Sequence, residues 1–118
     1  MIQHIKTPSL IKVPGDKKIE EFFGLVNSNT NEVSIARMTS PEGWSEPEQT
    51  PEFNEYTLVL KGKLKITTKN NVYILNENEA ILTTKGETVQ YSTPFTGGAE
   101  YVAICLPAFS IDLVNRNE

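Results

Sequence analysis

Side chains that bind transition metals or act as nucleophiles are rare in this sequence. The chain has one histidine, His4, and one cysteine, Cys105. A structural zinc site needs four sulfur or nitrogen ligands, and the iron site of non-haem oxygenases needs two histidines with a carboxylate, so neither can form within the chain. A bound metal would need mostly oxygen ligands, which favours magnesium, calcium or manganese.

The two scarce residues themselves are expected to be structural. Cys105 stands between Ile104 and Leu106 in an apolar run, where a cysteine is typically a small buried hydrophobe. A single cysteine also excludes a disulfide within the chain and fits a reducing compartment. His4 is expected on the surface.

The composition is that of one globular domain. The chain has 118 residues, of which 38% are apolar and 22% charged, and this length leaves no room for a second independent core. No apolar run approaches the roughly 20 residues of a membrane-spanning helix. The first residues, Met1 to Lys6, lack the apolar stretch of a secretory signal. We expect one cytoplasmic domain over residues 1–118, with no membrane partner.

The charge pattern does not favour nucleic-acid binding. The net charge is −4, and the lysines are scattered except for Lys61, Lys63 and Lys65, which recur at every second residue. In a strand this spacing places all three on one face, which is typical of a solvated sheet face or a protected edge.

The first half of the chain predicts few regular elements. Proline and glycine interrupt the apolar pieces before residue 16, so these pieces predict brief edge strands. Residues 17–23 predict a helical turn or a short strand. A strand follows over 33–38, with Val33, Ile35 and Arg37 on one face. Residues 39–53 are rich in proline and polar residues and predict a long functional or disordered loop. Trp44 lies inside it and indicates that the loop is packed down.

The second half predicts short antiparallel strands at regular spacing. Lys61-Gly62-Lys63 is expected to be a hairpin turn, Asn70-Asn71 a further turn, and residues 110–114 a helical turn. The expected strands span residues 56–60, 64–68, 72–75, 80–83, 88–91 and 100–106. This pattern is typical of an all-β antiparallel sandwich or barrel.

One spacing in the chain is shared with a known family. Gly43 is followed after five residues by Gln49-Thr50-Pro51, after three more by Glu55, and after six more by Gly62. This resembles the first motif of the cupins, in which Gly, His-x-His, Glu and Gly stand at those places. The stretch Thr84 to Val89 resembles the second motif, of which Gly86 remains.

The resemblance covers residues 32–106 and implies a double-stranded β-helix, the cupin jelly-roll barrel. The stretches 41–53 and 91–94 also resemble a group of small single-domain bacterial cupins without a firmly assigned activity. In cupins that bind metal, three histidines and the glutamate hold one cation inside the barrel. Here Gln49, Pro51 and Val89 stand in place of the histidines and Glu55 alone is kept, so the usual transition-metal site is not expected.

The resemblance places Glu55 inside the barrel, and strand alternation then places Thr57 and Val59 there too. By the same alternation, Tyr91 accompanies Val89. A buried Glu55 would have a raised pKa, suited to acid–base work near neutrality. It could also hold a hard cation or anchor a hydrogen bond, whereas the plain alternative is a carboxylate that faces water at a strand start.

Four further side chains are candidates for a ligand site, each beside a plain alternative. Gln49 could orient a polar ligand group or be a polar loop residue. Tyr91 could donate its phenol to the cavity or be an aromatic core residue. Arg37 could clamp a carboxylate, pair with Glu55, or lie on the surface. Trp44 could line the cavity mouth or simply pack.

Three functions remain open from the sequence. The first is a binding module that holds a small polar or carboxylate-bearing metabolite in the barrel. The second is a metal-independent isomerase, epimerase or lyase with Glu55 and Tyr91 as an acid–base pair. The third is the binding of a hard divalent cation, the one metal cofactor still open, by Glu55, Gln49 and Glu48. We also expect a homodimer, because cupins commonly pair through their sheets and the apolar residues near the N-terminus could cross to a partner.

Overall fold

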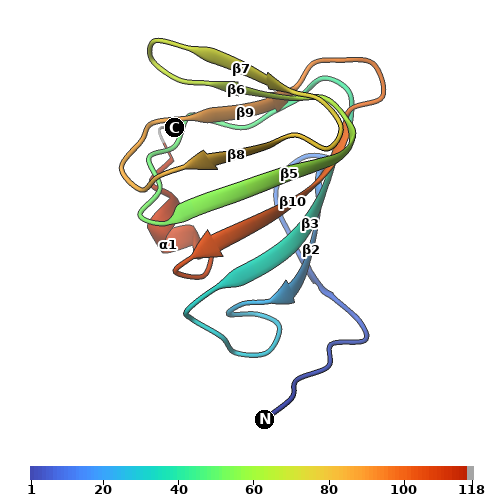
Figure 1. Cartoon of the computed structure of the whole chain (residues 1–118), viewed down its shortest axis with the longest axis vertical. Coiled ribbons are helices and arrows are strands. Elements are labelled where there is room, and N and C mark those ends of the chain that lie inside the picture. The colour runs from blue at the N-terminus through green and yellow to red at the C-terminus, as the bar shows by residue number, and fades with distance from the viewer. Residues whose placement is uncertain (117–118) are drawn as a thin grey trace.

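The computed structural model describes residues 1–116 and shows two antiparallel sheets packed face to face (Figure 1). One sheet has six strands in the order β1-β2-β3-β10-β5-β8, and the other has four in the order β4-β9-β6-β7. The elements are β1 (Ser9–Ile11), β2 (Lys18–Phe23), β3 (Ser34–Ser40), β4 (Trp44–Ser45), β5 (Asn54–Gly62), β6 (Leu64–Thr67), β7 (Val72–Leu75), β8 (Ala80–Thr83), β9 (Gln90–Thr93), β10 (Ala99–Leu106) and α1 (Ile111–Val114). The expected all-β fold is confirmed.

The core lies between the sheets and follows from side-chain alternation along the strands. Along β5, Glu55, Thr57 and Val59 are buried while the residues between them are exposed, as a strand with one face on the core requires. Val89 and Tyr91 are buried as well, so both expected inward faces are confirmed. The main apolar cluster consists of Val59, Leu64, Ile66, Leu75, Val89, Tyr91, Ala99 and Tyr101.

The connection at Gly62 corrects the prediction of a hairpin. β5 pairs with β10 and β8, whereas β6 pairs with β7 and β9, so Lys61-Gly62-Lys63 is a corner at which the chain changes sheet. A glycine between two strands is expected both at a hairpin turn and at a corner between sheets, because both require a sharp change of chain direction. The expected turn at Asn70-Asn71 is confirmed, and it joins β6 and β7, which pair directly as a hairpin.

Two segments are more regular than their sequence predicts. Residues 18–23 form a strand, β2, which settles the choice between helix and strand. The segment 39–53, expected as one irregular loop, contains the end of β3 and the short strand β4, which pairs with β9. Gln49 then forms an isolated bridge with Val89. This segment is therefore held against the edge of the smaller sheet by backbone hydrogen bonds.

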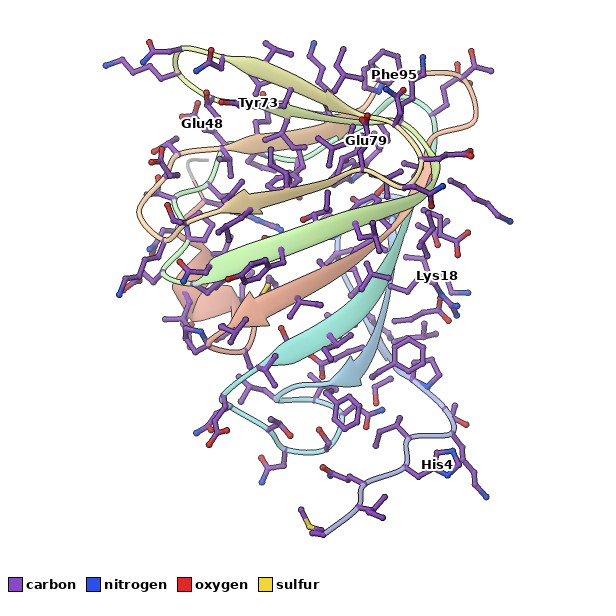
Figure 2. All side chains as sticks on the ribbon, in the orientation of Figure 1. His4, Lys18, Glu48, Tyr73, Glu79 and Phe95 are labelled. Atoms are coloured by element: carbon purple, nitrogen blue, oxygen red, sulfur yellow. The ribbon has the colours of Figure 1, made fainter. Side chains whose placement is uncertain are left out.

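Both ends of the described chain lie outside the two sheets. The first eight residues form no strand and extend away from the barrel, and His4 is exposed there as expected (Figures 1 and 2). The predicted helical turn near the C-terminus is α1, capped by the Ser110 side chain. None of the helices in residues 1–116 has the length and apolar character needed to cross a membrane.

Candidate functional site

Polar side chains line a small cavity between the two sheets, which we call the inner cavity. Its volume is about 40 Å³, and because a single water needs about 10–15 Å³ on this measure, it has room for only a few waters or one small polar group. Its walls come from both sheets and from the segments that close the barrel: Lys17, Ile19, Met38, Glu46, Gln49, Phe53, Glu55, Tyr91, Tyr101, Cys105, Phe109 and Arg116.

A second, larger pocket adjoins the inner cavity, and we call it the mouth pocket. Its volume is about 150 Å³. It lies between β4 and the segment that leads into β2, and is lined by Val13, Pro14, Lys17, Ile19, Trp44, Ser45, Glu46, Pro47 and Arg116. Lys17, Ile19, Glu46 and Arg116 line both spaces. Together the two spaces form one candidate site, which reaches from the surface to Glu55.

Glu55 lies at the inner end of this site with an unusually high pKa. The β5 register sets it opposite Cys105 of β10 and Thr83 of β8, and its side chain is buried. Burial raises the pKa of the Glu55 carboxyl to about 7, with a further rise from the Glu46 charge and a partial reversal from Lys17. The carboxyl can therefore give or take a proton near neutral pH.

Tyr91 reaches the same cavity from the other sheet. Its hydroxyl is 3.0 Å from Oγ1 of Thr83, the residue paired with Glu55 across the strands. Burial raises the Tyr91 pKa well above its usual value, and the Glu55 charge raises it further. The phenol thus stays protonated, as a hydrogen-bond donor beside a titrating carboxyl.

A buried ion pair separates the inner cavity from the mouth pocket. Lys17 Nζ lies 3.7 Å from Oε1 of Glu46, and both side chains are about nine-tenths buried. The ammonium also lies 4.3 Å from the centre of the Trp44 ring. Burial raises the pKa of Glu46, while the charges of Lys17 and Arg116 act in the opposite direction. The pair thus places opposite charges at the boundary between the two spaces.

Three polar atoms in this region are buried without a hydrogen-bond partner among residues 1–116. They are Oε2 of Glu46, Nε of Arg116 and Oγ1 of Thr57. An unpaired buried polar group costs roughly 1–3 kcal/mol, and native proteins keep few of them. Two of the three residues line the candidate site, so the site has hydrogen-bonding capacity that the described residues leave unused.

The structure brings together most of the side chains expected from the sequence. Glu55, Tyr91 and Gln49 line the inner cavity, and Trp44 lines the mouth pocket. Cys105 is buried as expected, and burial raises its pKa, so the thiol is unreactive.

Two of the candidate side chains lie outside the site. Arg37 lies on the outer face of β3, where its Nε is 3.1 Å from Oε1 of Glu20, because even and odd residues of this strand face opposite sides. It neither pairs with Glu55 nor lines the cavity. Glu48 is exposed on the segment between β4 and β5 (Figure 2), so it lies outside the cation site proposed for it.

Sequence reasoning missed Lys17, Glu46 and Arg116. Lys17 and Arg116 lie outside residues 32–106, the stretch that carries the motif spacing, so no motif points to them. Glu46 has a local signal: it lies three residues before Gln49 in the same proline-rich segment. Its burial depends on the pairing of β4 with β9, which the sequence did not predict.

The donor set does not fit a metal ion. Pro51 and Val89, at two of the cupin histidine positions, have no ligand atom, and no group of three or more histidine, cysteine, aspartate or glutamate side chains is close enough to hold an ion in residues 1–116. Glu46 is the carboxylate that would have to replace Glu48 as a ligand, and the Lys17 ammonium lies beside it. A cation there would meet like charge, so no chemistry is assigned to a metal.

Comparison with known proteins bears on the fold more than on the activity. No protein-family profile matches the sequence. A protein of Myxococcus xanthus described as endoribonuclease YbeY is 37% identical over 111 residues. The match covers 94% of this chain but only 38% of that protein. The chain therefore corresponds to a minor part of its relative.

Solved structures with the same architecture share little sequence with the chain. An RmlC-like cupin from Shewanella frigidimarina aligns with a TM-score of 0.74 at 13% identity, over 95% of this chain and 94% of that one. KdgF from Halomonas aligns with a TM-score of 0.70 at 10% identity, over 90% of this chain and 91% of that one. Oxalate decarboxylase from Bacillus subtilis aligns at 0.77 and 13%, over 95% of this chain and 30% of that one. With the two sheets and their topology, these likenesses establish that the protein has the cupin fold, a double-stranded β-helix.

Proposed function

We propose that the protein binds a small carboxylate-bearing metabolite, with the body of the ligand in the mouth pocket and a polar group directed toward Glu55. The Arg116 guanidinium carries this proposal. It lines both spaces, and its Nε is buried without an acceptor among residues 1–116. Guanidinium and carboxylate form strong charge-assisted hydrogen bonds, often two at once. A ligand carboxylate would therefore supply the missing acceptor.

The charges that face the site also favour an anion. Lys17 and Arg116 are positive, whereas Glu46 already pairs with Lys17. Glu55, with a pKa of about 7, carries only part of a negative charge near neutral pH. One cation is thus left without a full counter-charge, and a monoanionic ligand restores the balance.

The size of the site limits the ligand to a small molecule. Drug-sized ligands occupy roughly 300–1,000 Å³, while the mouth pocket has about 150 Å³. RNA cleavage, the activity in the name of the Myxococcus relative, is not part of this proposal. The pocket is too small for a nucleotide, and the chain has a net charge of −4, which disfavours a polyanion.

Replacing Arg116 tests the proposal, with tert-butylacetate as the probe carboxylate. We expect the wild-type protein to bind it in preference to tert-butylacetamide, and Arg116→Gln to weaken binding about ten- to hundredfold, the value of one or two charge-assisted hydrogen bonds. Titration followed by the fluorescence of Trp44, the only tryptophan, measures both affinities because its ring lines the mouth pocket.

The matched control is Arg37→Gln, since Arg37 is the other arginine of the chain and lies on the outer face of β3. It should leave binding unchanged. Equal binding of the carboxylate and its amide, or equal losses in both variants, would contradict the proposal.

A second candidate function is acid–base catalysis on the bound carboxylate. The observation that favours it is the arrangement of Glu55, with its pKa of about 7, and the protonated Tyr91 around one cavity. A base with this pKa can take a proton from carbon, and a phenol can stabilise the enolate that forms. An isomerase, epimerase or lyase would begin with this step.

Deuterium exchange into pyruvate tests this second candidate, with nuclear magnetic resonance to follow the methyl group. We expect the protein to accelerate exchange, with a rate that rises through about pH 7 as Glu55 loses its proton, and Glu55→Gln to lower the rate about 10²–10⁴-fold. Binding of pyruvate without faster exchange would contradict the catalytic candidate and leave the binding function in place.

The homodimer also stays a proposal. Ile2 and Leu10 are 95% and 65% exposed, and β1 is an edge strand of the larger sheet, so this part of the chain is available to a second copy. Light scattering should give twice the mass of one chain, and a single-chain mass would overturn the proposal. The single domain over 1–118 and the cytoplasmic location likewise remain expectations.

A further inference from the structure

The ammonium group of Lys17 lies in a partly aromatic enclosure, which we call the ammonium cage and define by Trp44, Tyr101 and Glu46. Lys17 Nζ is 4.3 Å from the centre of the Trp44 ring and 5.7 Å from that of Tyr101. Its carboxylate partner is Oε1 of Glu46 at 3.7 Å. Two aromatic faces with one carboxylate are the elements with which proteins recognise organic cations.

The cage has acceptor capacity that Lys17 leaves unused. Glu46 is 8% exposed, and its second oxygen, Oε2, is buried without a hydrogen-bond partner in the described part of the chain. An isolated buried oxygen of this kind is costly, and Lys17 does not relieve the cost from its present position. A ligand cation of different shape could contact both oxygens.

The attachment of Lys17 allows its side chain to leave the cage. Lys17 is the last residue before β2, and the first β2 residue paired with β3 is Lys18. The segment before it contains Pro14 and Gly15 and forms no strand. Withdrawal of the Lys17 side chain therefore breaks no strand pairing, and the mouth pocket that Lys17 lines lies directly outside.

We infer that the ammonium cage is a recognition site for a small organic ammonium group, and that Lys17 fills it only while no ligand is bound. Arg116 lines the same mouth pocket. A molecule with an ammonium at one end and a carboxylate at the other would contact the cage and Arg116 together. The inference thus rests on the proposed function for its carboxylate half, and it narrows the ligand class to amino-acid-like zwitterions.

Two probes of the same shape separate this inference from the proposed function. Glycine betaine has a trimethylammonium group and a carboxylate, and tert-butylacetate has a quaternary carbon in place of the nitrogen. In the wild-type protein, betaine should bind more tightly and change the Trp44 fluorescence more strongly. Binding of tert-butylacetate alone would overturn the cage and leave the carboxylate site standing. Failure of both probes would overturn both proposals.

Removing the internal competitor provides the second test. Lys17→Met keeps the length of the side chain but leaves the cage without a cation. If Lys17 occupies the cage about nine-tenths of the time in the wild type, betaine should bind this variant about tenfold more tightly. The affinity for tert-butylacetate should not increase. Lys18→Met, next in the chain and 57% exposed, is the matched control and should change neither affinity. Unchanged or weaker betaine binding to Lys17→Met would overturn the inference.

Discussion

Replacing Glu55 by glutamine is expected to stabilise the protein at alkaline pH and to leave its stability unchanged in acid. The unfolded chain titrates Glu55 near 4.5, and the folded protein titrates it near 7 because burial penalises the charged form. A carboxyl whose pKa is higher in the folded state than in the unfolded state stabilises the folded protein, and this contribution is fully present below pH 4.5. That contribution is lost as the pH rises to about 7.

The expected size follows from the gap between these two pKa values. At 1.36 kcal/mol per pH unit the wild type loses about 3 kcal/mol relative to Glu55→Gln between pH 4.5 and 7. Urea unfolding of both proteins at several pH values between these limits and at about pH 8 measures the difference. Glu87→Gln removes an exposed carboxyl and should show no such trend. A difference between Glu55→Gln and wild type that does not vary with pH would contradict the assignment.

Replacing Gly62 by alanine is expected to cause a large loss of stability. Gly62 makes the corner between β5 and β6 with a φ of 77°, and a Cβ there would overlap the carbonyl oxygen of Gly98. That oxygen belongs to the backbone of a tight turn before β10, so it cannot move aside as a side chain could. Left-handed strain and overpacking together should cost about 3–5 kcal/mol, or about 15 °C in Tm.

Gly86 provides the matched comparison for this prediction. It has a similar φ of 88°, but a Cβ there would meet nothing within 4 Å. Gly86→Ala should therefore cost only the conformational strain, about 1–2 kcal/mol. Thermal unfolding of both variants separates strain from collision. Equal losses would show that the contact between Gly62 and Gly98 does not determine the corner.

The fold was predictable because its signals are local. Alternation along the strands and the turn residues between them indicate an antiparallel sandwich or barrel, and the spacing shared with the cupins selects the barrel. The same local signals could not show that the turn at Gly62 changes sheet. Which edge a strand joins depends on contacts with residues far away in the chain, here Ala99 of β10.

The candidate site was predictable only where it coincides with the shared spacing. Glu55 and Gln49 were found because the motif places them, and Tyr91 because it follows Val89 by two residues along a strand. Arg37 was misplaced because an arginine near a strand end carries no local sign of which sheet face it joins. No sequence pattern indicated Lys17 or Arg116, because these residues come together in one pocket only through the topology of the folded chain.

The position of Lys17 and Arg116 in one pocket has a consequence for how the protein acquires its function. These residues are far apart in the sequence, so the pocket has both of its cationic walls only after the strands between them have assembled into the two sheets. Contacts of such long sequence separation form slowly, and those supported by few backbone pairs open first in local unfolding. Opening of the bridge that holds Arg116 to Gln49 should therefore weaken carboxylate binding before the barrel itself unfolds.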